Sequence, residues 1–190
     1  DNWFNKSTSL EPVFDLYFGT FYNREIYLHQ RFLNLSQALE SYHRRIFPGK
    51  YQSDEEYLRG LYEVFMRSIP NDLDNDFKAR LTNRMKYLNE FSLRKRLSDL
   101  KQKYAEILGL LLHNIDKFIE DTVNTRNFLT HYDLSLKNKA KRGEELYILC
   151  EKLKFFLEVC FLFELGLSSN KVKTLVEKCE SYRDIKRMPD

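Results

Sequence analysis

Residues 112–133 read LHNIDKFIEDTVNTRNFLTHYD, and this stretch decides the class of fold. Its apolar residues recur at steps of three and four, which is the spacing of one face of an amphipathic helix. These residues are Leu112, Ile115, Ile119 and Val123. The last third of the stretch adds an arginine, an amide and a histidine, at Arg126, Asn127 and His131. The stretch therefore predicts a helix that buries one side in a core and carries chemically active side chains near its end.

Apolar residues with the same helical spacing occur on both sides of this stretch. Pro48-Gly49 ends one such segment, and Ser53 with Glu56 has the pattern of a capping box at the start of the next. Gly109 is expected to break or bend the fourth segment. The expected helical segments are 24–46, 53–69, 77–90, 92–108, 112–131, 144–165 and 170–186, with a short helix at 10–22. We therefore predict an all-α fold, an antiparallel helical bundle with additional helices.

The segment 144–165 is expected to form a helix that turns one apolar face inward, because its apolar residues follow helical spacing. Gly166 is a candidate C-cap for this helix. The residues expected to face inward are Leu146, Leu149, Cys150, Leu153, Leu157 and Cys160.

The composition agrees with this class of fold. The 190 residues carry 31 Lys and Arg against 28 Asp and Glu, and 43% are hydrophobic, which is typical of a soluble globular protein. Only 6 Gly and 4 Pro are present, which disfavours a turn-rich β fold. Three Cys without a C-x-x-C pair favour neither a disulfide framework nor a zinc site. This cysteine usage makes the reduced cytoplasm the expected location, and no apolar stretch is long enough to span a membrane.

The chain begins Asp1-Asn2-Trp3, without an initiating Met and without a signal pattern. We expect residues 1–23 to be a lead-in that joins an upstream domain, which would act as a sensor. Residues 24–190 are expected to form one helical domain, because the length suits a single domain with an appended segment.

The end of the opening stretch places a permanent cation close to a base that titrates near neutral pH. Steps from Ile119 through Thr122 to Arg126 keep the guanidinium on the apolar side of the helix, where an unpaired charge is costly. His131 follows five residues later and would lie about 140° around a regular helix. The two groups would meet only if the helix ended near Leu129, or if two chains paired across a two-fold axis.

An arginine and a histidine brought together in this way suit cleavage of a phosphodiester bond in RNA without a metal. The imidazole takes a proton from the ribose 2′-hydroxyl or gives one to the leaving 5′-oxygen, and the guanidinium stabilises charge on the phosphate. No His lies at ligand spacing from another His or from a Cys, and the sequence contains neither a glycine-rich phosphate loop nor a nucleophile elbow. We therefore expect neither a metal nor a cofactor.

The spacing of arginine and histidine is weakly specific, because Arg24 and His29 repeat it. From spacing alone, either copy is more often an exposed arginine near an unrelated histidine. The copy at Arg126 differs, because Asn127 follows it directly and can orient a partner or a phosphate. A basic loop comes after this copy and can follow an RNA backbone. The candidate substrate-binding residues in this loop are Lys137, Lys139, Lys141 and Arg142.

Residues 118–132, FIEDTVNTRNFLTHY, resemble the signature of the HEPN superfamily, an arginine followed by a polar residue and then a histidine, and specifically that of the ApeA-like HEPN domain. Residues 32–44, FLNLSQALESYHR, resemble the first long helix of that group. With the order and spacing of the helices, the resemblance covers about residues 10–167. It implies an all-helical domain that forms a homodimer, brings two such motifs into one cleft and acts as a metal-independent endoribonuclease in bacterial anti-phage defence.

The resemblance also implies roles for individual residues. Arg126 and His131 correspond to the catalytic pair and Asn127 to the polar helper, with RNA as the substrate and transfer RNA as one candidate. The resemblance gives no support to Arg24 and His29, which repeat the spacing. Three residues could support the site, namely Tyr132 and the pair Glu40 and His43. The pair lies three residues apart on one face of the expected first helix, although exposed polar pairs at this spacing are common.

Two other functions stay open from the sequence. The chain could be a non-catalytic helical module of a larger defence protein, which binds RNA or protein or holds two chains together. HEPN domains also often accompany nucleotidyltransferases, so Tyr132 could accept an adenylyl group. The sequence has no carboxylate pair arranged for two metals, so in that case the chain would be the acceptor and not the transferase.

Overall fold

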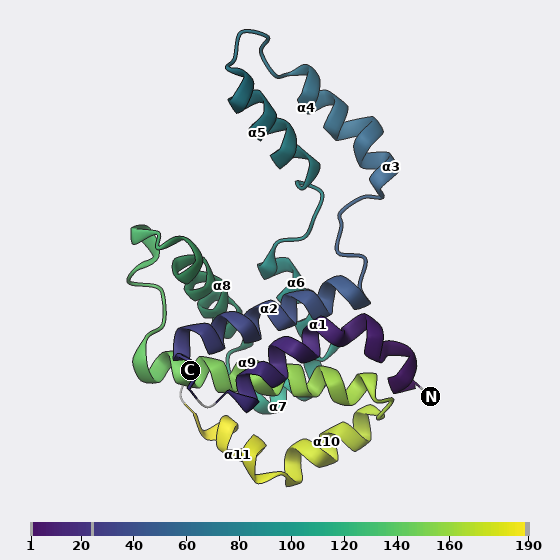
Figure 1. The fold of residues 1–190 in the computed structure, drawn as a ribbon. Coiled ribbons are helices and arrows are strands. Elements are labelled where there is room, and N and C mark those ends of the chain that lie inside the picture. The colour runs from purple at the N-terminus through teal and green to yellow at the C-terminus, as the bar shows by residue number, and fades with distance from the viewer. Residues whose placement is uncertain (1, 24, 189–190) are drawn as a thin grey trace. The chain divides into compact units, whose positions relative to one another are not determined.

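The computed structural model describes residues 2–23 and 25–188, with the backbone alone at residues 2–5 and 7 (Figure 1). No β-strand occurs in this described part, so the all-α prediction is confirmed. The α-helices are α1 (Asn2–Tyr22), α2 (Leu28–Ile46), α3 (Asp54–Tyr57), α4 (Glu63–Arg67), α5 (Asn75–Lys86), α6 (Leu93–Lys103), α7 (Ala105–Leu111), α8 (Ile115–His131), α9 (Gly143–Glu164), α10 (Ser169–Lys178) and α11 (Glu180–Arg187). Two short segments complete them, the π-helical η1 (Leu58–Tyr62) and the 3₁₀-helical η2 (Leu134–Leu136). None of the described helices is long and apolar enough to cross a membrane.

Contacts within the chain divide it into two compact units. Unit 1 comprises residues 1–47 and 93–190, and unit 2 comprises residues 48–92. Residues 1–23, expected as a lead-in, contain α1, which packs on α2 and α9. Its side chains Leu10, Val13 and Tyr17 are buried in the core of unit 1. In the structure, α1 therefore belongs to the same compact unit as α2 and α9.

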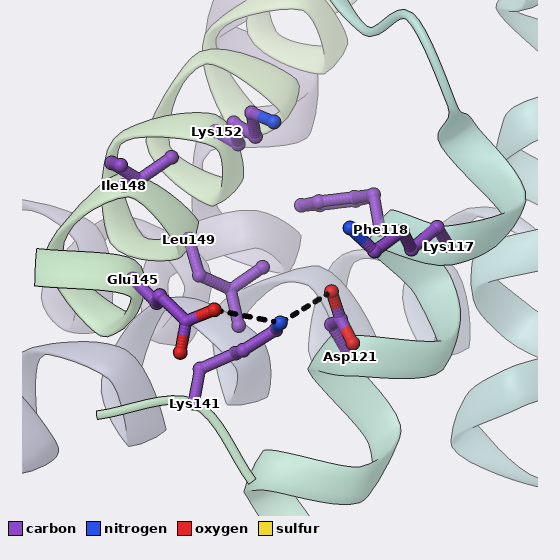
Figure 2. A pocket seen from close by; sticks show the side chains of 8 residues that line it. All are labelled: Lys117, Phe118, Asp121, Lys141, Glu145, Ile148, Leu149 and Lys152. Atoms are coloured by element: carbon purple, nitrogen blue, oxygen red, sulfur yellow. Dashed lines mark hydrogen bonds and ion pairs between the residues drawn. The ribbon is translucent and has the colours of Figure 1, made fainter. Parts of the chain in front are cut away.

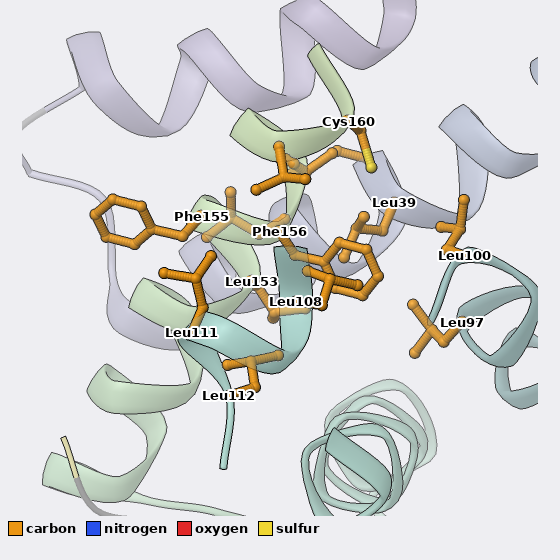
Figure 3. Close-up of a cluster of buried hydrophobic side chains, with 14 of the residues drawn as sticks. Leu39, Leu97, Leu100, Leu108, Leu111, Leu112, Leu153, Phe155, Phe156 and Cys160 are labelled. Carbon is orange, nitrogen blue, oxygen red and sulfur yellow. The ribbon is translucent and has the colours of Figure 1, made fainter. Parts of the chain in front are cut away.

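The core of unit 1 forms around α9, which contacts α1, α2, α8, α10 and α11. The inward face predicted for this helix is confirmed, because all six of its predicted residues are buried. Figure 3 shows Leu153, Phe156 and Cys160 of α9 meeting leucines from α2, α6 and α7. Gly166 follows the helix with a positive φ of 83°, which a glycine adopts at little cost. A helix buried on several sides explains why this segment is so rich in apolar residues.

The fourth expected segment is divided at Tyr104, whereas the sequence pointed to Gly109 as the break. Tyr104 leaves the helical conformation with φ −110° and ψ 21°, and Gly109 lies inside α7. The Tyr104 side chain is buried, and its hydroxyl lies 2.6 Å from that of Tyr42 in α2. The Tyr42 hydroxyl also donates to Glu164 of α9 at 2.7 Å. This buried hydrogen-bond network with α2 and α9 accounts for the position of the break.

Two other boundaries differ from those expected. The helix expected from residue 24 begins at Leu28, because Tyr27 is extended with ψ 143°. The expected last helix is divided into α10 and α11 at Cys179, which is extended. The division lets Val176 and Ile185, on the two helices, both reach the core of unit 1.

Unit 2 contains the segments α3, η1, α4 and α5. The predicted capping box is present, because the Ser53 hydroxyl accepts from the Glu56 N–H at 3.2 Å and the Glu56 carboxylate accepts from the Ser53 N–H at 3.0 Å. Asp74 caps α5 by accepting from the Phe77 N–H at 3.1 Å. The apolar residues of these segments have helical spacing, yet Leu58 and Leu61 remain about half exposed at 48% and 47%.

Candidate active site

Helix α8 carries the arginine and histidine singled out in the sequence, and its two ends are well defined. The Asn114 side chain caps the start by accepting from the Lys117 N–H at 3.0 Å. At the other end, Tyr132 adopts the left-handed conformation with φ 50°, and its N–H donates to the carbonyl of Phe128 at 2.6 Å. The helix therefore stays regular through His131 and does not end near Leu129.

This regular course determines how the two motif side chains lie in one chain. Arg126 and His131 are five residues apart on the same helix, so they point about 140° apart around its axis. The two side chains could meet through an early end of the helix or through pairing of two chains. The structure shows no early end, because α8 continues to His131. A single chain therefore holds the guanidinium and the imidazole on different sides of α8.

Arg126 lies in a polar groove between α2 and α8 with a volume of about 420 Å³. The groove is lined by residues of both helices: Gln30, Leu33, Ser36, Gln37, Glu40, Ser41, Arg44, Arg126 and Thr130. The Arg126 side chain is 35% exposed, so a ligand in the groove can reach its guanidinium. His131 is exposed on the last turn of α8 and is not part of the lining.

Two neighbours hold the Arg126 guanidinium. Its Nη1 donates to the Asn127 side-chain oxygen at 3.3 Å, and its Nη2 lies 3.7 Å from Glu40 Oε2 on α2. The same Glu40 carboxylate accepts from Arg44 Nη2 at 3.1 Å. Two arginines of the groove therefore approach one carboxylate, and a planar guanidinium such as that of Arg126 is suited to bind a phosphate.

Glu40 and His43, expected as a supporting pair, have different neighbours. His43 is fully buried on the side of α2 that faces α6. Its Nδ1 lies 3.2 Å from Arg96 Nη1, and its Nε2 lies 3.2 Å from Asp99 Oδ2. An arginine can only donate, so Nδ1 accepts and Nε2 carries the proton toward Asp99. Burial lowers the pKa of His43 below its usual value, against the opposing effect of the Asp99 hydrogen bond.

The basic residues after α8 fall into two groups. Lys137 and Lys139 are exposed, and the exposed Arg142 lies over the Phe128 ring at 5.1 Å. Lys141 is turned inward, and its backbone N–H donates to the Thr125 hydroxyl at 3.0 Å. The structure therefore places three of the four predicted substrate-binding residues where a polyanion can reach them.

Figure 2 shows how the Lys141 ammonium group lies between two carboxylates. It is 3.1 Å from Glu145 of α9 and 3.5 Å from Asp121 of α8. Partial burial lowers the pKa of Lys141, but the two carboxylates outweigh this effect and raise it overall. Together with Lys117 and Lys152, these three groups line a recess of about 140 Å³. The other residues that line the recess are apolar. Lys141 therefore joins α8 to α9 across this recess.

Tyr132 is 71% exposed, and its ring lies 5.8 Å from that of Phe128. Arg24 lies outside the described residues, so the structure does not describe the second copy of the spacing.

Sequence reasoning missed Arg44, which lines the groove with Glu40 and Arg126. Its position four residues after Glu40 on one helix was the signal that could have found it. Within the described residues, no group of three or more His, Cys, Asp or Glu side chains is placed to hold a metal ion.

Comparison with known proteins connects this geometry to a family. The family model described as ApeA-like HEPN matches residues 33–171, which is more than half of the chain. The matched range includes most of α2, all of α8 and all of α9, and so both walls of the groove. No curated protein and no solved structure matches the chain.

Proposed function

Because the chain belongs to the ApeA-like HEPN family, we propose that it is a metal-independent endoribonuclease whose active centre uses Arg126 and His131. HEPN domains are generally ribonucleases, and they typically bind RNA and dimerise. The observation that carries the proposal is the Arg126 guanidinium, which lies partly exposed in a polar groove beside Asn127 and Arg44. A guanidinium in this position can hold a phosphodiester group while negative charge builds on its oxygens.

The proposed reaction uses the ribose 2′-hydroxyl as the nucleophile. A base removes the 2′-hydroxyl proton, the 2′-oxygen forms a bond to phosphorus, and the bond from phosphorus to the 5′-oxygen breaks as that oxygen gains a proton. The products are a 2′,3′-cyclic phosphate and a 5′-hydroxyl. His131 is exposed, and an imidazole can both accept and donate a proton, so it suits the proton transfers. DNA lacks the nucleophile and would not be cut.

The divergent directions of Arg126 and His131 support a homodimer as the active form. In a two-fold pair, the α8 helices of two chains can face each other so that the arginine of one chain approaches the histidine of its partner. The exposed Lys137, Lys139 and Arg142 would then extend the binding surface along the RNA backbone. The substrate we propose is RNA, with transfer RNA as one candidate, and the setting is bacterial anti-phage defence in the cytoplasm.

A decisive test is complementation between two inactive variants. Total bacterial RNA is incubated in excess EDTA with wild type, with Arg126→Ala, with His131→Ala, and with a co-refolded mixture of both variants. Wild type should cut and leave cyclic phosphate ends, and each variant alone should not. If each site takes its arginine and its histidine from different chains, the mixture should recover about a quarter of wild-type activity, because half of its dimers hold one intact site of two.

The control is His29→Ala, which changes an exposed histidine at the same spacing after an arginine and should cut like wild type. Recovery of no activity in the mixture, with active wild type, would place both groups of one site in one chain. Cutting by Arg126→Ala or His131→Ala alone would overturn the assignment of the pair.

One observation favours a second function. In a single chain the guanidinium and the imidazole lie on different sides of α8, so a chain that does not dimerise holds no catalytic pair. The alternative is a non-catalytic module that binds RNA or protein in a larger defence protein. It predicts salt-sensitive RNA binding by wild type with the RNA left intact.

A further inference from the structure

Unit 2 folds without an apolar core of its own. In residues 48–92, all of which the structure describes, Tyr57 is the single buried hydrophobic side chain. Val64 and Phe77 are 58% and 50% exposed, and Leu88 is 57% exposed. Small folded units rarely leave this many large apolar side chains in water unless another surface covers them. These side chains therefore indicate an interaction surface.

The base of unit 2 is fixed by contacts between its two ends. The Phe91 N–H donates to the Gly49 carbonyl at 2.9 Å, and the Phe91 ring lies 4.7 Å from that of Tyr51. The Asn89 side chain donates to the Gln52 carbonyl and accepts from the Gln52 N–H, both at 2.9 Å. These contacts join the two ends of the unit, so its two helical segments leave from a fixed base.

Each of the two helical segments has an apolar side that is incompletely covered. In the first segment, residues 54–67, Leu58, Leu61 and Val64 follow each other at steps of three. In the second segment, α5 and the turn after it, Phe77 and Leu88 are exposed, and Leu81 and Met85 between them are half-buried. In α5, Phe77, Leu81 and Met85 follow each other at steps of four and share one side of the helix, whereas the first segment exposes part of its apolar residues on the π-helical η1. Unit 2 therefore presents two apolar stripes.

The two segments carry opposite charge. In the first segment, four carboxylates stand against two arginines, whereas α5 has four cations and a single carboxylate. The carboxylates of the first segment are Asp54, Glu55, Glu56 and Glu63, and the cations of α5 are Lys78, Arg80, Arg84 and Lys86. A surface with one acidic and one basic half is complementary to a copy of itself turned about a two-fold axis.

We propose that unit 2 is a self-association surface that binds unit 2 of a second copy of this chain. In the pair, the acidic first segment of each copy lies along the basic α5 of its partner, and the apolar stripes of all four segments meet between them. The residues that carry this proposal are separate from Arg126 and His131. The proposal therefore stands or falls independently of the ribonuclease activity.

RNA is a less suitable occupant of the same surface. The cations of α5 would attract its phosphates, but the carboxylates of the first segment would repel them, and the apolar stripes would stay uncovered. A second copy satisfies the acidic half, the basic half and the apolar stripes together.

A charge-swap experiment on the full chain tests the pairing. One variant, Glu55→Lys with Glu63→Lys, gives cations an excess in both segments. The other, Arg80→Glu with Arg84→Glu, gives carboxylates an excess in both. Each variant should repel its own copies, and the two together should restore attraction at both contacts. The variants are co-expressed with different tags and purified through both tags, so that mixed pairs are selected.

The readout is amide hydrogen exchange in residues 54–67 and 75–86, which reports on unit 2 alone even where unit 1 also dimerises. We expect exchange to be about tenfold faster in each variant alone than in wild type, and to return to the wild-type rate in the co-purified pair. A misfolded variant would not be rescued by its partner, so recovery separates repulsion from misfolding. Lys171→Glu with Lys178→Glu in α10 makes the same change in charge as Arg80→Glu with Arg84→Glu, but outside unit 2, and should leave these rates unchanged.

Three results would overturn the proposal. Exchange in unit 2 could be the same in wild type and in both variants, which would show that no second copy covers the surface. It could be faster in both variants and stay fast in the co-purified pair, which would show that the charges do not pair between copies. It could slow only on addition of RNA, which would identify a nucleic-acid surface.

Discussion

The guanidinium of Arg126 lies 3.7 Å from the carboxylate of Glu40, across the groove between α8 and α2. The carboxylate stands where an anionic ligand of Arg126 would approach, so it both orients the guanidinium and competes with a phosphate. This relationship leads to a prediction about binding that is separate from cutting.

Glu40→Gln should tighten RNA binding about two- to fivefold at low salt, because a partly exposed ion pair contributes about 0.2–1 kcal/mol and its loss frees Arg126 for the phosphate. Binding is measured by fluorescence anisotropy with labelled RNA in a His131→Ala background, in which the RNA should stay intact. Glu120→Gln removes an exposed carboxylate from α8 outside the groove and serves as the matched control. Equal or weaker binding by Glu40→Gln would show that the carboxylate does not compete with RNA.

The buried His43 should make the stability of the protein depend on pH. Burial lowers its pKa below the usual value of 6.5, so the unfolded chain takes up a proton at a higher pH than the folded chain does. The stability is therefore complete above about pH 6.5 and falls as the pH decreases through the range below it. The limiting slope for one proton is about 1.4 kcal/mol per pH unit.

Urea unfolding at a series of pH values from 8 to 5 measures this slope. His43→Gln should be less stable at pH 8, because it disturbs the contacts with Arg96 and Asp99, and it should lose most of the slope between pH 6.5 and 5. His29→Gln changes an exposed histidine and should keep the wild-type slope. A slope that is the same in His43→Gln and in wild type would assign it to other groups.

Much of the fold could be predicted from the sequence, because α2, α8 and α9 each place apolar residues at helical spacing and then bury that face. The break at Tyr104 could not be predicted in this way. It depends on a hydroxyl network with Tyr42 and Glu164, which lie far away in the sequence. The boundary of unit 2 was also missed, because its segments have the spacing of buried helices while their apolar residues stay exposed.

The candidate site was predictable in part for the same reason. Spacing on one helix pointed to Arg126, Asn127 and His131 only together with the resemblance to the HEPN signature, but spacing by itself defined the angle between the first and the last of them. It could not show that Glu40 meets Arg126, since that contact needs α2 and α8 to pack together. Reasoning from helical spacing also treated Glu40 and His43 as one pair. Helix α2 has neighbours on several sides, so these residues contact α8 and α6 respectively.

Leu153→Ala should reduce the free energy of unfolding by about 2–5 kcal/mol, because Leu153 is fully buried in the middle of α9 and the substitution leaves a cavity. Leu134→Ala removes the same atoms from a side chain that is 79% exposed, and its effect should stay within about 0.5 kcal/mol. Urea unfolding of both variants at pH 8 checks the pair. Similar losses in the two variants would contradict the core around α9.

The basic residues after α8 should separate into a binding group and a structural group. Lys139→Ala removes an exposed cation, so it should reduce the slope of log binding constant against log salt by about one when the lysine contacts a phosphate. Lys141→Ala should leave that slope nearly unchanged, because its ammonium is held between Asp121 and Glu145. It should instead lower stability by about 1–2 kcal/mol, since it leaves these carboxylates without their shared cation. RNA titrations at several salt concentrations and urea unfolding measure both effects, and a larger change of slope in Lys141→Ala than in Lys139→Ala would contradict the division.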